Sequence, residues 1–124
     1  VSAMSGNMEK LCKIRDVQRS IIAFEQRFVK RHGICLNEGM LLCSLHQSER
    51  LSSGELGELL GLTPSNTSKV ITSVEEKGLI TRILGTTDKR QMYFALTEKG
   101  REKIASICCE EVEIPEFLNE IIAS

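Results

Sequence analysis

The chain has 124 residues and a formal net charge of −1, with 41% hydrophobic, 27% charged and 4% aromatic residues. This length and composition predict one soluble globular domain, and the scarcity of aromatic rings argues against a surface that stacks single-stranded nucleic acid. No apolar run approaches the roughly 20 residues that span a bilayer, and the N-terminus lacks the apolar stretch of a signal peptide, so we expect a cytoplasmic protein without a membrane partner.

The first predicted element is a long helix over residues 8–31, because apolar side chains recur there at steps of three and four. The helix is expected to end at His32-Gly33. Its apolar stripe is wider than one packing partner requires, so we expect it to pair with a second chain. The stripe consists of Leu11, Ile14, Val17, Ile21, Ile22, Phe24, Phe28 and Val29.

Two shorter helices follow. Asn37 is expected to cap a helix at about residues 38–47, which carries Met40, Leu41, Leu42 and Leu45. Ser52-Ser53-Gly54-Glu55 has the spacing of a capping box and predicts a third helix that ends at Gly61. The side chains expected to face inward from this third helix are Leu56, Leu59 and Leu60.

Thr63 and Pro64 predict the start of a fourth helix, because threonine caps helices and proline suits the first helical position. Its inward face consists of Thr67, Val70, Ile71 and Val74. Two short helices joined by a tight turn predict a helix-turn-helix, whose second helix fits the major groove of DNA. Its outer face carries small polar or cationic side chains that can reach base edges: Ser65, Asn66, Ser68, Lys69, Thr72 and Ser73.

Residues 79–84 and 91–96 then change to a strand pattern and predict a hairpin, or wing, with a polar tip. Segment charges support a role at DNA, since residues 63–104 carry a net charge of +3, whereas residues 105–124 carry −5. A fifth helix is expected from Thr97 until Pro115 interrupts it, with a short last helix at residues 116–123.

The tip of the wing offers two cations, Lys89 and Arg90. A narrow A·T-rich minor groove attracts a planar guanidinium, so we expect this tip to enter it. Asp88 is expected to hold Arg82 or Arg90 through a charge-assisted hydrogen bond, and so to orient the wing.

Three motifs in this order resemble the MarR family of transcriptional regulators: residues 62–82, Asp88-Lys89-Arg90, and Leu96-Thr97-Glu98-Lys99-Gly100. The resemblance covers about residues 51–104. It implies a winged helix-turn-helix in an intertwined helical homodimer, which binds a pseudo-palindromic operator in double-stranded DNA. It also implies that Arg90 enters the minor groove, that Asp88 steadies it, and that a small aromatic or anionic effector or thiol oxidation relieves repression.

We therefore predict a mainly α fold with a small two- or three-stranded antiparallel wing. Residues 7–48 are assigned to dimerisation and packing, residues 49–97 to DNA binding, and residues 98–124 to C-terminal dimerisation helices.

The expected function is sequence-specific transcriptional regulation, most simply repression. The alternative is a winged helix that binds a protein partner instead of DNA. An enzyme is not expected, because no nucleophile is paired with a base, and no cofactor is implied.

The chain has five cysteines without a paired spacing, which predicts reduced thiols and no metal site. Cys12 is a candidate redox sensor, because it lies among basic residues, and the resemblance places sensor thiols of some relatives early in the same helix. A metal-sensing repressor is disfavoured, because residues 52–61 contain no Cys or His ligand.

Overall fold

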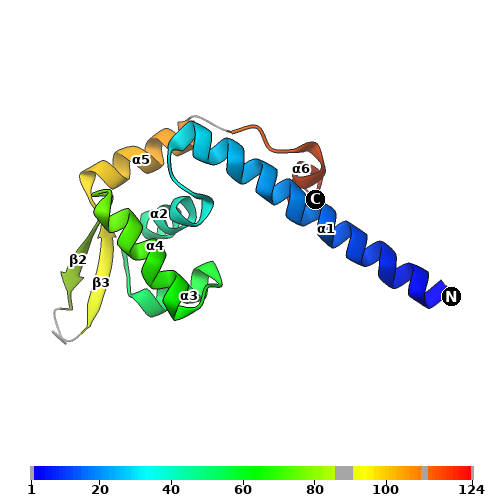
Figure 1. The fold of residues 1–124 in the computed structure, drawn as a ribbon. Coiled ribbons are helices and arrows are strands. Elements are labelled where there is room, and N and C mark those ends of the chain that lie inside the picture. The colour runs from blue at the N-terminus through cyan, green and yellow to red at the C-terminus, as the bar shows by residue number, and fades with distance from the viewer. Residues whose placement is uncertain (1, 86–90, 110–111, 124) are drawn as a thin grey trace. The chain divides into compact units, whose positions relative to one another are not determined.

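The computed structural model describes residues 2–85, 91–109 and 112–123, and the side chains from residue 6 onward. In chain order its elements are α1 (Ser2–His32), α2 (Leu36–Gln47), β1 (Arg50–Leu51), α3 (Ser53–Leu60), α4 (Pro64–Glu76), β2 (Ile80–Leu84), β3 (Met92–Leu96), α5 (Glu98–Cys109) and α6 (Glu116–Ala123) (Figure 1). This confirms the expected mainly helical class with a small antiparallel sheet.

The chain divides into two compact units. Unit 1 combines Val1–Gly33 with Val112–Ser124, and unit 2 is Ile34–Glu111. The functional roles assigned to residues 7–48, 49–97 and 98–124, and the pairing of two chains, stay predictions. Among the described residues, no helix combines the length and the apolar character that crossing a membrane requires.

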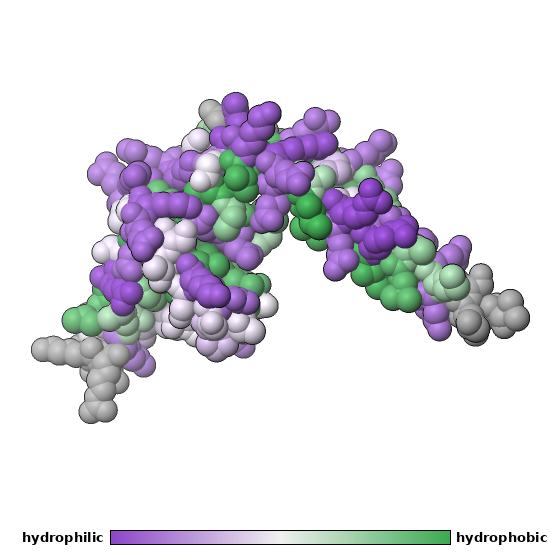
Figure 2. Space-filling view, in the orientation of Figure 1, coloured by the Kyte–Doolittle hydropathy of each residue, from purple (hydrophilic) through white to green (hydrophobic). Residues whose placement is uncertain are grey.

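Unit 1 is built from α1 and α6, which pack against each other. The predicted long helix is confirmed and begins earlier than expected, at Ser2. The Arg27 guanidinium of α1 donates a hydrogen bond to the backbone carbonyl of Glu113, at 3.0 Å. Much of the apolar stripe stays exposed, and Figure 2 shows it as green side chains along the helix. Its exposed members are Leu11, Ile14, Ile21, Ile22 and Val29, and exposed Met8 extends the stripe toward the N-terminus.

Helix α2 supplies the centre of unit 2. Leu41, Leu42 and Leu45 are almost completely buried. The predicted cap was wrong: the helix begins at Leu36, and the residue before it, Cys35, is the N-cap in place of Asn37. The cap works because Glu38 accepts a hydrogen bond from the backbone N–H of Cys35, at 2.9 Å.

Helices α3 and α4 form the helix-turn-helix. The capping box at Ser52 and Glu55 is confirmed, with hydrogen bonds of 3.2 and 3.0 Å. Gly61 ends α3 with a φ of +68°, a left-handed conformation that glycine adopts without steric cost. Thr63 then caps α4 by accepting a hydrogen bond from the N–H of Asn66. The prediction for Leu59 was wrong, because this side chain is 62% exposed.

The wing is confirmed and belongs to a three-stranded antiparallel sheet in the order β1-β3-β2. Strand β2 pairs with β3 from Ile80 opposite Leu96 to Leu84 opposite Met92. The sequence pattern had not located β1, which pairs with the other edge of β3. At the base of the wing, Ile80 and Leu96 are both buried, so this end of the hairpin is anchored in the core of unit 2.

Helix α5 packs closely against the start of β2. The Thr97 hydroxyl donates to the carbonyl of Gly78 and accepts from the N–H of Gly100, at 2.7 and 3.0 Å. The N–H of Thr97 donates to the carbonyl of Leu79, at 3.0 Å. A Cβ atom at Gly100 would overlap that carbonyl oxygen and lie 3.0 Å from its carbon. Only glycine therefore lets the first turn of α5 pack this closely.

Candidate nucleic-acid interface

The outer face of α4 is polar and accessible. The structure brings the predicted base-contacting residues together on this face, and all of them are exposed: Ser65, Asn66, Ser68, Lys69 and Thr72. We call these five residues the reading face. Three of them border a shallow depression of about 320 Å³ on the helix surface. The opposite side of α4 is held in the core by Thr67, Ile71 and Val74, which are buried.

Ser73 was also predicted on this outer face. It is half-buried and borders the same depression as Ser68, Lys69 and Thr72. By helical angle Ser73 lies about 20° from Asn66 and about 40° from Lys69, so it belongs to the edge of this face. Its hydroxyl is already bound, because it donates a 2.7 Å hydrogen bond to Glu38 of α2.

Glu38 is a residue that sequence reasoning missed. Its side chain is only 5% exposed and forms an ion pair with Lys77, the residue that follows α4. The Lys77 ammonium donates to both carboxylate oxygens, at 2.9 and 2.7 Å. Burial raises the pKa of Glu38, but the hydrogen bonds from Lys77, Cys35 and Ser73 outweigh it and lower the pKa to about 2. The carboxylate is therefore charged at neutral pH.

The end of α4 is held by two further contacts from unit 2. Nε and Nη2 of Arg82 in β2 donate to the two carboxylate oxygens of Glu75 in α4, at 2.7 and 3.1 Å, and lower the pKa of that carboxyl. Lys99 of α5 donates to the carbonyl of Lys77, at 3.0 Å. The C-terminal end of α4 is thus bound to α2, to the wing and to α5.

Arg82 was predicted to be an orienting residue of the wing, held by Asp88. Within the described residues its carboxylate partner is Glu75, and its guanidinium carbon also lies 5.6 Å from the ring centroid of Phe94. Asp88 and the predicted wing-tip cations Lys89 and Arg90 lie outside the described residues. Their roles stay predictions.

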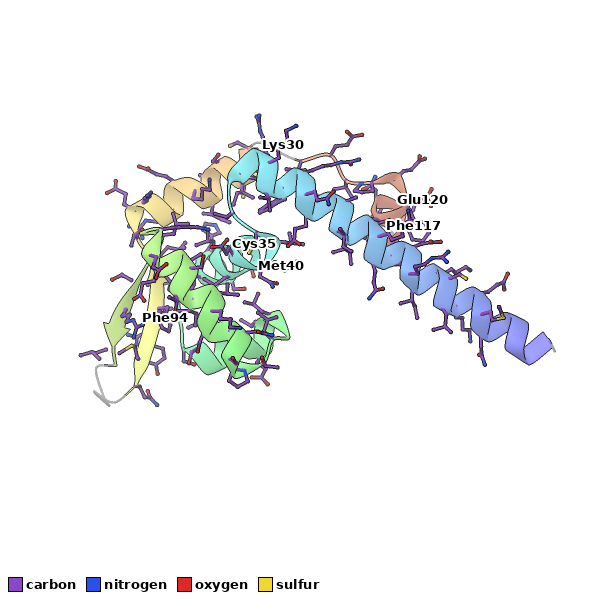
Figure 3. The ribbon with its side chains drawn as sticks, viewed as in Figure 1. Lys30, Cys35, Met40, Phe94, Phe117 and Glu120 are labelled. Carbon is purple, nitrogen blue, oxygen red and sulfur yellow. The ribbon has the colours of Figure 1, made fainter. Side chains whose placement is uncertain are left out.

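The cysteines differ in their surroundings. Cys12, the candidate sensor, is exposed on α1, and all five cysteines are free thiols. Cys35 is half-buried at the start of α2 (Figure 3), and burial raises the pKa of its thiol, which makes it less reactive. Within the part of the chain that the structure describes, no three His, Cys, Asp or Glu side chains are grouped to hold a metal ion.

Unit 2 also has an open cavity of about 350 Å³ away from the reading face. Its walls come from the end of α2, from β3 and from α5: Leu45, His46, Glu49, Ala95, Leu96 and Arg101. The volume is near the lower limit for small-molecule sites, and a lining of both apolar and polar residues is usual in such sites.

Comparison with known proteins places this geometry in a family context. Residues 34–92 match the model of the MarR family. The transcriptional repressor MprA of Escherichia coli (strain K12) is 26% identical over 102 residues, which cover 81% of this chain and 57% of MprA. The chain spans little more than half the length of these curated relatives. These relatives are named as transcriptional regulators, not as enzymes.

Solved structures share the fold. The transcriptional regulator BldR from Sulfolobus solfataricus superposes with a TM-score of 0.69 at 23% identity, covering 97% of this chain and 94% of BldR. The MepR–DNA complex from S. aureus gives a TM-score of 0.63 at 18% identity, covering 88% of this chain and 84% of MepR. At these identities the similarity establishes the winged helix-turn-helix fold.

Proposed function

We propose that the chain is a member of the MarR family, whose model matches residues 34–92, and a sequence-specific DNA-binding transcriptional regulator that acts as a homodimer on a pseudo-palindromic operator. The observation that carries the proposal is the reading face. Five exposed polar or cationic side chains project from one helix whose opposite side is fixed in the core. MepR, a protein of the same fold, has been crystallised with DNA.

The reading face has the chemistry that the major groove requires. Asn66 can pair with the N6 and N7 atoms of adenine, and Lys69 can reach a guanine or a phosphate, with each well-formed base contact contributing about 1–3 kcal/mol of discrimination. Ser65 and Asn66 lie in the first turn of α4, where free backbone N–H groups also favour phosphate. Lys89 and Arg90 would add contacts from the wing, with Asp88 orienting them.

The dimer is supported by the exposed apolar stripe of α1. Burying a large aliphatic side chain contributes about 1.5–3 kcal/mol, so six exposed apolar residues on one helix are a substantial unsatisfied surface. Helix α6 adds three exposed apolar side chains to this surface: Phe117, Ile121 and Ile122. Figure 3 labels Phe117 and Glu120 on α6. A two-fold dimer would present two copies of α4 about one DNA turn, roughly 34 Å, apart.

We further propose that the protein represses transcription and that an effector relieves this repression. MprA and MdtR are named repressors. A small aromatic or anionic molecule, or oxidation of Cys12, would act by changing the spacing of the two reading faces. Such coupling is typically worth 1–3 kcal/mol. The exposure of Cys12 meets one requirement of a sensor thiol.

DNA binding is tested by selecting bound fragments from a random DNA pool at low salt, where phosphate contacts are strongest. The wild type is expected to enrich an inverted repeat with half-sites about one turn apart. Asn66→Ala is expected to relax the preference at one base position in each half-site by roughly ten-fold or more. Arg90→Ala is expected to weaken enrichment of A·T-rich flanks.

Lys30→Ala serves as the control, because it removes an exposed positive charge from α1 and leaves the reading face intact. It should enrich the same repeat as the wild type. If the wild type enriches no sequence, DNA binding is refuted and a winged helix that binds a protein partner becomes the better assignment.

Dimerisation is tested by sedimentation equilibrium of the wild type, Ile14→Glu and Glu9→Lys. Ile14 is 56% exposed on the apolar stripe, and a carboxylate there would be buried unpaired in a dimer. We expect the wild type to have twice the mass of the chain and Ile14→Glu to be monomeric. Glu9 is exposed and lies at least about 100° around the helix from every exposed apolar residue of α1, so Glu9→Lys should stay dimeric. A monomeric wild type, or a dimeric Ile14→Glu, would contradict the assignment.

A further inference from the structure

One buried carboxylate joins the start of α2 to the end of α4. Oxygen Oε1 of Glu38 accepts from the N–H of Cys35 and from Lys77 Nζ, both at 2.9 Å. Oxygen Oε2 accepts from Ser73 Oγ and from Lys77 Nζ, both at 2.7 Å. We call Glu38, Ser73 and Lys77 the Glu38 cluster. Because the side chain of Glu38 is 5% exposed, water replaces few of these bonds.

The cluster constrains rotation of α4 about its own axis. Ser73 and Lys77 are four residues apart and so lie on the same side of the helix, toward α2. The outer side chains of a helix lie about 5–6 Å from its axis, so a rotation of roughly 10° moves them by about 1 Å. A recognition surface must be held within about 0.5 Å and 10–20° of its productive geometry. The Glu38 cluster therefore controls a movement that matters to the reading face.

Directional bonds add to the apolar packing that holds α4 in the core. Replacing a buried charged pair with apolar residues of similar volume often leaves stability unchanged, so stability alone does not call for a charge here. Hydrogen bonds from one hydroxyl and one ammonium to one carboxylate are satisfied in a narrow range of orientations. The buried charge of Glu38 is therefore explained better by a role in orienting α4 than by a role in stabilising the fold.

The cluster also lies next to the link from α1. Gly33 follows α1, and Cys35, whose N–H binds Glu38, is two residues further on. The N-cap of α2 is therefore connected through Glu38 to Ser73 and Lys77. Ser73 is 35 residues and Lys77 is 39 residues from Glu38 in sequence, so this connection exists only in the folded protein.

We propose that Glu38 is a positioning residue for the recognition helix, which fixes the rotation of the reading face and couples it to the chain segment after α1. The proposal rests on the proposed DNA-binding function. It concerns the orientation of α4 and assigns Glu38 no contact with DNA.

The experiment measures the specificity ratio, which is the affinity for the selected operator divided by the affinity for random DNA. It uses the full chain, well below the melting temperature of each variant. Glu38→Gln, Ser73→Ala and Lys77→Met are each expected to lower the ratio at least ten-fold while affinity for random DNA changes less than two-fold. Glu38→Gln combined with Ser73→Ala should lower it no further than Glu38→Gln alone, because both act on one set of bonds.

Lys77→Arg should restore the ratio to within two- to three-fold of the wild type, since a guanidinium can bridge both oxygens of a carboxylate. Ser44→Ala is the matched control, because its hydroxyl donates to the carbonyl of Met40 within α2 and it is not part of the Glu38 cluster. A purely structural role would lower the melting temperature and leave the ratio unchanged. An unchanged ratio in Lys77→Met and Ser73→Ala would overturn the proposal even if Glu38→Gln failed to fold.

A second measurement separates this proposal from the proposed function. Without DNA, hydrogen exchange of the amides of residues 73–77 is expected to be at least ten-fold faster in Glu38→Gln than in the wild type, while amides of α3 are unchanged. If the wild type selects no operator, the proposed function fails and this exchange measurement alone decides whether Glu38 holds α4. Unchanged exchange would overturn the positioning role.

Discussion

Replacing Gly100 with alanine is expected to lower the free energy of unfolding by roughly 3 kcal/mol, the upper end of the usual cost of overpacking. The added methyl would overlap the carbonyl oxygen of Leu79, which is fixed by the N–H of Thr97. The obstacle is backbone, so no side chain can rotate away. Helix α5 would have to move and break the bonds between Thr97, Gly78 and Gly100.

Urea unfolding followed by circular dichroism measures the loss in free energy of unfolding. In a thermal melt, the melting temperature should fall by about 10 °C. Gly54→Ala is the control, because the nearest atom to a Cβ there is Ser52 Oγ at 3.9 Å. This control should be as stable as the wild type or slightly more stable, since alanine favours the helix. Equal stability of Gly100→Ala and Gly54→Ala would show that α5 does not require this close approach.

Replacing Glu38 with glutamine is expected to remove about 3 kcal/mol of stability at neutral pH, and the loss should depend on pH. The pKa of Glu38 is lowered from 4.5 to about 2 in the folded protein. A lowered carboxyl pKa contributes stability that is fully present above the unfolded value and is lost as pH falls through the folded value. The difference between wild type and Glu38→Gln should therefore shrink from pH 5 toward pH 2.

Chemical denaturation of both proteins between pH 3 and pH 7 measures this difference. Glu75→Gln is the matched control: its carboxyl also has a lowered pKa, but the pair with Arg82 is half exposed and screened by solvent. Its effect on stability should be much smaller across the same range. A Glu38→Gln difference that stays constant with pH would contradict the folded pKa and its cause.

Local sequence signals predicted much of this fold. The caps at Ser52 and Thr63 and the proline after Thr63 located both helices of the helix-turn-helix, because capping depends on residues only three or four apart. The wing strands were located to within one residue. Cys35 was missed as the cap of α2, because cysteine is not a preferred capping residue. The capping-box spacing from Cys35 to Glu38 was the signal that could have revealed it.

The candidate site was predictable where it depends on one helix face and not where it depends on packing. The five residues of the reading face follow from the period of α4 alone, and all are exposed. That the hydroxyl of Ser73 is bound by Glu38 could not be predicted, because Glu38 lies 35 residues earlier in the sequence. Leu59 was misplaced because periodicity marks an apolar face without showing where its edge meets solvent.

The division of the chain has a consequence for how it folds. Unit 1 combines one segment that precedes unit 2 in the sequence with one that follows it. The hydrogen bond between Arg27 and Glu113 joins residues that are 86 positions apart. Closing a flexible loop of that length costs roughly 4 kcal/mol of chain entropy, whereas the hairpin and the helix-turn-helix close over short loops. We therefore expect unit 2 to fold before unit 1 is complete. During synthesis α1 precedes α6, so the apolar stripe of α1 is uncovered at that stage and exposed to aggregation.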